Sequence, residues 1–398
     1  MMKILAVNAG SSSLKFQMYE MPEEKELIWG YFEKIGLKDS FYSIKINGEK
    51  VRKDVELSNH SVAVGFLAKE LLENNIVESL EEVKGVGHRI VQGADKFDRT
   101  VVIDDIVEDT ISDLSVMAPL HNPAAVVGIK AFREFMPNAV HTAVFDTAFH
   151  QTLPEEAYMY ALPYEWYEKY GVRKYGAHGT SHKYVSERIN EILGRRDTKI
   201  VVCHLGSGCS VSAVENGKCI DTSMGFTPNA GLVMGTRCGD IDASIIPYIM
   251  NMTNMTPSEI DTTINKKSGL LAISGVGSDN RDVEKGALEG NKRCILAQNM
   301  FARRVVEYIA KYYVLMSGID AICFAAGIGE NGCMMREKIM DRLSVFGVVP
   351  DKEANKARGE EVLITKKDSK IPCYVIPTNE EVMIARDTYD LVLDENNV

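Results

Sequence analysis

The chain is 398 residues long, 45% hydrophobic and 25% charged, a composition typical of an ordinary globular protein large enough for two domains. Its net charge of -11 argues against a nucleic-acid partner, because binding the phosphate backbone needs a basic face. No apolar run reaches the roughly 18 residues of a membrane span, so we expect no membrane partner either.

The N-terminal stretch predicts two strands joined by a tight turn. Residues 3–7 (KILAV) are apolar, residues 8–13 (NAGSSS) are small, and residues 14–19 (LKFQMY) alternate in polarity. No signal-peptide core precedes the first strand, and we therefore expect a cytoplasmic protein. All eight cysteines lie from Cys203 onward without a Cys-x-x-Cys pair, which fits small buried hydrophobes in a reducing compartment.

Several elements are expected before residue 100. A strand is predicted over 27–35, a β-hairpin over 42–57 through its Asn-Gly pair, and a helix over 62–72. Residues 83–93 (VKGVGHRIVQG) predict a strand that carries Arg89 into a glycine-bounded turn. A charged arginine at such a place needs an anion beside it. The partner of Arg89 can be an anionic ligand or a carboxylate in a structural ion pair, and both interpretations stay open.

Polar residues follow the next predicted elements. Asn122 is predicted as the N-cap of a helix with Pro123 in its first position. A buried strand over 140–145 ends in Asp146, where an acidic residue can do metal or catalytic work or cap the next turn. The Tyr- and Trp-rich residues 158–175 are interpreted as packing, whereas His178, in the glycine-containing loop after them, is a candidate for catalysis.

Residues 199–240 repeat the N-terminal arrangement. A strand over 200–203, the turn Gly206-Ser207-Gly208, a strand over 210–214 and a hairpin through an Asn-Gly pair follow one another. Such a turn is often only a turn, but glycine also lets the backbone wrap a phosphate. A third strand over 322–325 ends in a glycine-rich loop, and together these pieces suggest a duplicated core with nucleotide between its halves.

The remaining chain is mainly helical. Helices are predicted over 241–250 and 257–264, a polar loop over 275–282, and a long helical region over 283–316 broken near Gly290. A last strand over 373–377 leads into a final helix that Thr378 or Asn379 could cap.

The order of these elements resembles the superfamily of actin, heat-shock chaperones and sugar kinases. The resemblance implies an α/β fold with a duplicated actin-like (RNase H-like) ATPase core, two domains around a central nucleotide cleft. We expect residues 1–147 plus 379–398 to form an N-terminal domain with the first phosphate hairpin. Residues 148–378 would then form the C-terminal domain for nucleotide binding and dimerisation.

Nine motifs, in family order, make the chain similar to the acetate kinase family, with propionate kinase as a near relative. They are NAGSSSLKF, APLHNP, VFDTAFHQT, HGTSHKYV, DTSMGFTP, GLVMGTRCG, NKKSG, AAGIGEN and PTNEE. The resemblance implies reversible in-line phosphoryl transfer between ATP and acetate, giving acetyl phosphate and ADP, in a homodimer with Mg²⁺ or, as an alternative, Mn²⁺. The open alternatives are a propionate or short-chain fatty acid kinase and an actin-like or chaperone-like ATPase scaffold.

The resemblance also assigns roles to residues of this chain. Catalysis is expected from Asp146, Arg89, Arg237, His178 and His121. The substrate would contact Arg89, Val91, Leu120, Ala177 and Pro228, and the metal Asn8 and Glu380. The nucleotide would be bound by Ser11, Ser13, Lys15, His204, Leu205, Gly206, Ser207, Gly208, Asp279, Asn280, Arg281, Gly327, Ile328, Gly329, Glu330 and Asn331.

The sequence departs from the family pattern near the expected site. Ala177 replaces a phenylalanine, Ser207 replaces the asparagine of a GNG turn, and Asn280 replaces an aromatic residue. The charged residues are retained, so these departures bear on the choice of acyl chain and nucleotide.

Overall fold

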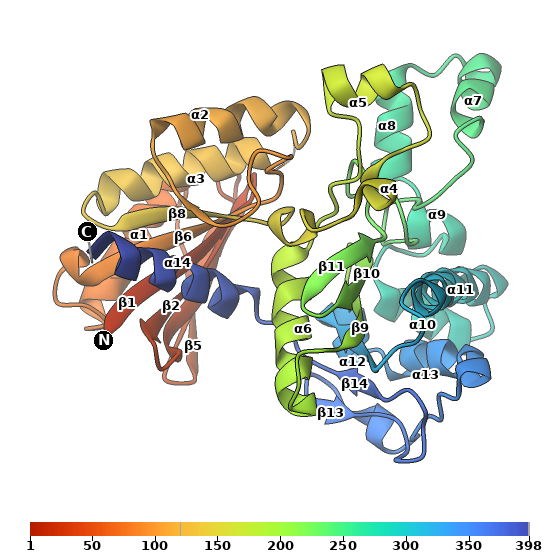
Figure 1. Ribbon diagram of the computed structural model, residues 1–398. Coiled ribbons are helices and arrows are strands. Elements are labelled where there is room, and N and C mark those ends of the chain that lie inside the picture. Colours follow the sequence, from red (N-terminus) through yellow and green to blue (C-terminus); the bar gives the residue numbers. More distant parts are fainter. Residues whose placement is uncertain (120, 397–398) are drawn as a thin grey trace. The chain divides into compact units, whose positions relative to one another are not determined.

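The computed structural model describes residues 1–119 and 121–396. The chain folds into two compact units, Met1–Phe149 with Asn379–Val398 (unit 1) and His150–Thr378 (unit 2). Each unit holds one sheet with helices packed on it (Figure 1), which confirms the predicted α/β class. No helix among the described residues is long and apolar enough to cross a membrane.

The sheet of unit 1 has eight strands: β1 (Met2–Ala9), β2 (Ser13–Met21), β3 (Lys25–Glu33), β4 (Phe41–Ile46), β5 (Glu49–Asp54), β6 (Val83–Ile90), β7 (Val101–Val102) and β8 (Val140–Phe145). Their order is β5-β4-β3-β2-β1-β6-β8-β7. β1 pairs with β2 antiparallel and with β6 parallel, and β6 pairs with β8 parallel. The carboxyl ends of β1, β6 and β8 therefore meet at one edge, where ligands bind in open α/β sheets.

Helices cover both faces of this sheet: α1 (His60–Glu73), α2 (Asp105–Asp113), α3 (Asn122–Phe135) and α14 (Glu380–Asn396). The strand alternation of β1 sends Leu5 and Val7 to the core under α1 and α3, whereas Ala6 packs with Ile384 of α14. Gly87 of β6 permits the close approach of α14, because a Cβ there would lie 2.3 Å from Thr388 Oγ1.

The sheet of unit 2 has six strands: β9 (Lys199–Leu205), β10 (Cys209–Glu215), β11 (Lys218–Thr222), β12 (Ala321–Ala325), β13 (Val362–Leu363) and β14 (Cys373–Val375). Their order is β11-β10-β9-β12-β14-β13, with β9, β12 and β14 parallel. The run β3-β2-β1-β6-β8 of unit 1 has the same arrangement as β11-β10-β9-β12-β14, so the predicted duplication is confirmed.

Unit 2 also contains α4 (Glu155–Tyr158), α5 (Tyr164–Tyr170), α6 (Gly179–Leu193), α7 (Ile245–Thr253), α8 (Pro257–Lys266), α9 (Gly269–Ser274), α10 (Asn280–Leu288), α11 (Lys292–Leu315), α12 (Ala326–Asn331) and α13 (Cys333–Arg342). The predicted helix break is confirmed at Gly290, whose φ of +85° is in the left-handed region. The predicted face of α11 is buried: Phe301, Val305, Ile309 and Tyr312 all belong to the core. The eight cysteines are free, and six of them are buried.

The prediction that Asn122 caps a helix is wrong. Asn122 is the first residue of α3, and His121 occupies the N-cap position without a side-chain cap. The buried Asn122 amide instead donates to the carbonyl of Gln92 (2.9 Å) and accepts from its N–H (3.2 Å). It thus satisfies the backbone of the turn after β6, a tertiary partner that takes precedence over a local cap.

Two other interpretations also need correction. The aromatic stretch before His178 is not simply packing, since Tyr164, Trp166 and Tyr170 of α5 are 56%, 43% and 70% exposed. The expected glycine-rich loop after β12 is the short helix α12. Its first turn is held by Glu330, whose carboxylate accepts from the N–H of Ala326 (2.8 Å) and from that of Thr378 (3.0 Å).

Candidate active site

Three charged residues of unit 1 meet at the carboxyl ends of its parallel strands. Arg89 lies near the end of β6, Asp146 directly follows β8, and Glu380 begins α14. Arg89 donates from Nε and Nη2 to the two oxygens of Asp146, at 3.0 and 2.7 Å, and its Nη1 lies 3.5 Å from Glu380 Oε2. This bidentate pairing fixes the plane of the guanidinium.

The electrostatics of this cluster are those of buried, coupled charges. Burial alone would lower the pKa of Arg89, but the carboxylates of Asp146 and Glu380 outweigh it and raise that pKa. Burial raises the pKa of Glu380; Arg89 opposes this rise and Asp146 adds to it. Arg89 is therefore cationic, and a further cation beside Glu380 would favour the charged form of its carboxyl group.

The other predicted residues of unit 1 lie on the same edge or beside it. Asn8 is on β1, next to the strand that carries Arg89, and the turn after it is closed by a hydrogen bond from Gly10 N–H to Ser13 O of 2.8 Å. Ser11, Ser13 and Lys15 belong to this hairpin, Val91 follows β6, and His121 is exposed before α3. Leu120 lies outside the described residues.

In unit 2, two predicted catalytic side chains flank the turn between β9 and β10. A Cβ on Gly208 would lie 3.3 Å from Arg237 Nη2 and 3.4 Å from His178 Nε2, so glycine lets both side chains approach the backbone. Burial lowers the pKa of Arg237, and no carboxylate among the described residues pairs with it. Its Nη1 donates to the carbonyl of Pro228 (2.8 Å). Among the described residues, no carboxylate accepts from the other N–H groups of the guanidinium.

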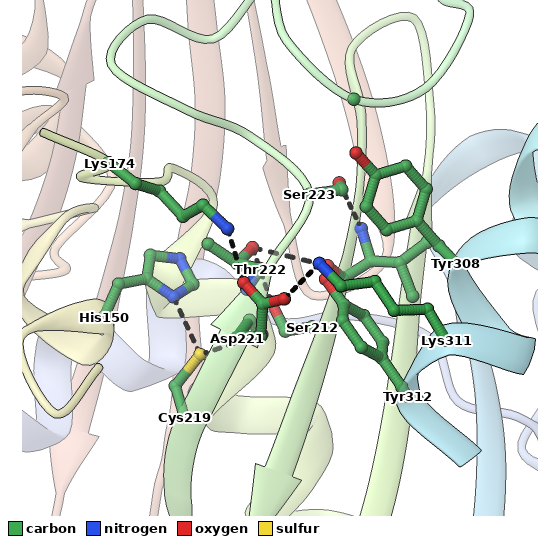
Figure 2. A network of polar contacts seen from close by, with 12 residues as sticks. His150, Lys174, Ser212, Cys219, Asp221, Thr222, Ser223, Tyr308, Lys311 and Tyr312 are labelled. Atoms are coloured by element: carbon green, nitrogen blue, oxygen red, sulfur yellow. Dashed lines mark hydrogen bonds and ion pairs between the residues drawn. The ribbon is translucent and has the colours of Figure 1, made fainter. Parts of the chain in front are cut away.

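The loop that carries His178 is held by β11 and its following turn. Figure 2 shows Asp221 between Lys174 and Lys311, with both Nζ atoms 2.5 Å from its carboxylate. His150 donates from Nε2 to the carbonyl of Ala177 (2.9 Å), and its Nδ1 lies 3.2 Å from Cys219 Sγ. The backbone of His178 is in the left-handed region (φ 59°), a strained conformation that these contacts stabilise.

A cavity of about 580 Å³ lies beside the turn between β9 and β10. This is an ordinary size for a small-molecule site. Predicted nucleotide residues that line it are Gly206, Ser207, Asp279, Asn280, Arg281, Gly327, Ile328 and Asn331. Sequence reasoning missed Ser278, Glu284, Gly332 and Arg358, which also line it.

Other predicted nucleotide residues are engaged elsewhere. The side chain of Leu205 is in the core, and Gly329 packs against the end of β12. Glu330 holds the first turn of α12. His204 is buried, with its ring 4.2 Å from that of His178 and its Nδ1 2.8 Å from Ser181 Oγ.

Sequence reasoning also missed Arg336 of α13, which is completely buried behind the cavity. Its Nη1 donates to the carbonyls of Gly329 and Glu330, both at 2.8 Å. Its Nη2 donates to the carbonyls of Asn355 (2.6 Å) and Ala357 (2.8 Å), and its Nε donates to Asn355 Oδ1 (2.9 Å). Arg336 thus joins the end of α12 to the segment before Arg358, and its only signal in the sequence is a charge at a buried helical position.

The donor groups of unit 1 suit a hard divalent cation. In the part of the chain that the structure describes, no three His, Cys, Asp or Glu side chains gather to hold a metal. Mg²⁺ is commonly held by one or two carboxylates together with substrate phosphates and water. The partly buried Glu380 and the amide of Asn8 fit such a partial ligand set.

Comparisons with known proteins agree over nearly the whole chain. A model of the acetokinase family matches residues 3–386. The chain is 54% identical over 393 residues to the acetate kinase of Geobacillus sp. (strain WCH70), covering 98% of this chain and 99% of that one. Among solved structures, the Porphyromonas gingivalis acetate kinase has a TM-score of 0.92 at 42% identity, covering 98% of this chain and 100% of that one. A propionate kinase from Francisella tularensis subsp. tularensis SCHU S4 has a TM-score of 0.93 at 41% identity, with the same coverage.

Proposed function

The chain belongs to the acetokinase family and is therefore a phosphotransferase with a carboxyl group as acceptor, and we propose that it passes the γ-phosphoryl group of ATP directly to acetate. The reaction is reversible and connects ATP and acetate with ADP and acetyl phosphate. A carboxylate that attacks a triphosphate brings negative charge toward negative charge. The work of the protein is thus positioning and charge neutralisation, with little acid–base chemistry.

The arginines supply the positive charge. Arg89 and Arg237 hold the carboxylate and the transferring phosphoryl group with planar forks, and His178 donates a hydrogen bond to an equatorial oxygen. The observation that carries this proposal is the fixed orientation of Arg89, with both Asp146 oxygens on one edge of its guanidinium. An arginine held in this way loses little entropy when it binds an anion.

Mg²⁺ fits the proposed site through Glu380 and Asn8. When bound with ATP, the ion would neutralise charge on the β- and γ-phosphate oxygens. The residues of the chain keep separate tasks: Asp146 orients Arg89, and the N-terminal hairpin with Ser11, Ser13 and Lys15 contacts phosphates. In unit 2, the turn with Gly206 and Gly208 covers the β-phosphate, and the 580 Å³ cavity takes the nucleoside.

An acyl-phosphate assay tests the function. ATP, a divalent ion and acetate should give a product that hydroxylamine traps as a hydroxamate, and the same assay with propionate and butyrate ranks the acceptors. Release of phosphate without a trappable product would instead favour the alternative of an ATPase scaffold. A propionate rate above the acetate rate would favour the propionate kinase alternative.

The substitution Ala177→Phe should narrow the acceptor pocket. We propose that Ala177 and Pro228 belong to the apolar wall around the acyl chain, where a phenyl ring would fill space that a longer chain needs. One methylene discriminates by roughly 1–3 kcal/mol in such a pocket. The ratio of kcat/KM for propionate to that for acetate should fall about tenfold.

The alternative is that a neighbouring side chain already fills the space beside Ala177. The Ala177→Phe variant distinguishes this alternative from an open pocket. Tyr175 is pinned by its hydroxyl, which donates to the carbonyl of Gly171 (2.7 Å), whereas Phe226 lies 6.1 Å from the Tyr175 ring and is partly exposed. Phe226→Ala, tested in parallel, should leave the ratio unchanged or raise it. An unchanged ratio in Ala177→Phe, with intact acetate turnover, would show that Ala177 does not set the size of the pocket.

We propose further that the protein is a homodimer formed through unit 2. Helices α7 and α8 are neighbours in that unit (Figure 1), and large apolar side chains of α7 are exposed: Ile245 46%, Tyr248 62% and Met252 67%. An apolar surface of this kind marks an interface. Sedimentation should give twice the chain mass of 44.2 kDa, and Tyr248→Glu should give the monomer. A wild-type monomer at micromolar concentration would contradict the proposal.

A further inference from the structure

A serine hydroxyl lies between two histidine rings in unit 2. Ser210 Oγ is 2.9 Å from Nδ1 of His178 and 2.7 Å from Nε2 of His182. A serine hydroxyl has one hydrogen to donate and lone pairs to accept with. It can therefore donate to only one of the two rings, and the other ring must donate to it.

The surroundings of His182 decide the direction of this chain. His182 is completely buried, and burial, together with His150 and His204, places its pKa well below the ordinary value. The ring is thus neutral and carries one hydrogen. Its Nδ1 has no hydrogen-bond partner among the described residues, so a hydrogen on Nδ1 would be a buried N–H without an acceptor, which native structures rarely contain.

The hydrogen of His182 therefore belongs on Nε2, from which it donates to Ser210. The hydroxyl hydrogen of Ser210 is then available for Nδ1 of His178, which must accept it as a bare nitrogen. If both rings donated to Ser210, neither ring would offer a bare nitrogen to accept the hydroxyl hydrogen of Ser210. One consistent arrangement remains, running from His182 through Ser210 to His178.

We propose that Ser210 and His182 are positioning residues that hold His178 in the tautomer with its hydrogen on Nε2. This is the nitrogen that lies toward Gly208 of the predicted phosphate turn. The tautomer follows from the contacts of the free protein, whereas its value for turnover rests on the proposed function. An Nε2–H offers a donor to a phosphoryl oxygen, and the opposite tautomer would offer a lone pair and repel it.

Nitrogen-15 NMR of histidine-labelled protein reads the tautomer directly. The spectra are recorded at a pH at which the His178 ring is neutral, and its signals are those that vanish in His178→Asn. Wild-type protein should show a protonated Nε2 and a bare Nδ1 that accepts a hydrogen bond. In Ser210→Ala the two shifts should move toward each other, as expected for a mixture of tautomers, while Ser210→Thr, which keeps the hydroxyl, should restore the wild-type shifts.

Ser212→Ala is the matched control, because Ser212 is a buried serine on the same face of β10 whose hydroxyl donates to Thr222 (2.9 Å). Ser212→Ala should leave the shifts of His178 unchanged and should change kcat by no more than about twofold. Ser210→Ala should lower kcat about tenfold, with KM for ATP nearly unchanged. A protonated Nδ1 on His178 in the wild type, or unchanged shifts in Ser210→Ala, would overturn the inference. Altered shifts with an unchanged kcat would confirm the tautomer and overturn its value for turnover.

Discussion

Replacing Arg89 or Arg237 by alanine should lower kcat by about two orders of magnitude or more in each case. Both side chains are aimed before any ligand binds: Arg89 by the two oxygens of Asp146, and Arg237 by the carbonyl of Pro228. A preorganised cation in a partly buried site stabilises charge that develops in the transition state, because no solvent has to reorganise. Initial rates of acyl phosphate formation, at saturating ATP and acetate, measure the effect.

The two alanine variants should differ in their stability. Arg89→Ala also leaves Asp146 and Glu380 facing each other without their shared cation, so this variant should lose stability as well as turnover. Arg237 pairs with no carboxylate among the described residues, and its loss removes a hydrogen bond to the carbonyl of Pro228 (2.8 Å), so the unfolding midpoint should fall less than in Arg89→Ala.

Lysine variants and an exposed arginine provide the controls. Arg89→Lys and Arg237→Lys should recover only part of the rate, because an ammonium group cannot form the planar fork. Arg303→Ala on the exposed face of α11 should retain the full rate, since it removes only a surface pair with Glu307. Near-normal turnover of a folded Arg89→Ala or Arg237→Ala protein would exclude that residue from the mechanism.

Much of the fold could be predicted from short-range patterns. The strands around the two phosphate turns are predicted by short apolar runs that break at small or glycine-containing turns, and the repetition of this arrangement predicts the duplicated sheet. The face of α11 followed from the spacing of Phe301, Val305, Ile309 and Tyr312. Asn379 was one of the two predicted caps of the last helix, and its side chain does accept from the N–H of Val382 (3.0 Å).

The errors arise where a distant partner overrides the local pattern. Asn122 has the type and position of an N-cap, yet its amide bonds to Gln92, 30 residues earlier. The residues from Ala326 to Asn331 contain two glycines and were expected to be a loop, but the carboxylate of Glu330 bonds to the first N–H and stabilises a helical turn. In α5, aromatic composition predicted packing, and composition alone cannot tell a core from an exposed apolar surface.

In the candidate site, too, features that depend on distant partners could not be predicted from local patterns. Asp146, Arg89 and Glu380 lie far apart in sequence and were connected only by family resemblance; the sheet order now gives a physical reason for their proximity. Ser210 was seen only as part of a strand, because its role depends on which atoms of two histidines face it. Arg336 was missed because four of its five acceptors are backbone carbonyls, which leave no pattern in the sequence, and the fifth, Asn355 Oδ1, lies 19 residues away.

The substitution Arg336→Met should lower the free energy of unfolding by about 3 kcal/mol or more and weaken nucleotide binding. Burial lowers the pKa of Arg336 to about 10, so the guanidinium stays protonated at neutral pH and all five of its hydrogen bonds persist. Methionine fills much of the volume but removes the donor from five acceptors, of which Glu330 O keeps the N–H of Gly359 (3.2 Å). A buried acceptor without its donor costs about 1–3 kcal/mol. The predicted loss is therefore much larger than that of a surface substitution.

Denaturant titration and kinetics separate the two consequences. The urea midpoint should fall, and KM for ATP should rise about tenfold because residues of α12 and Arg358 line the cavity. KM for acetate should change little. Arg342→Met is the matched control, since Arg342 is exposed at the end of the same helix and should leave both quantities within experimental error. If Arg336→Met unfolded at the wild-type midpoint and kept the wild-type KM for ATP, the carbonyls of Gly329 and Asn355 would not need this donor, and Arg336 would have no part in shaping the nucleotide cavity.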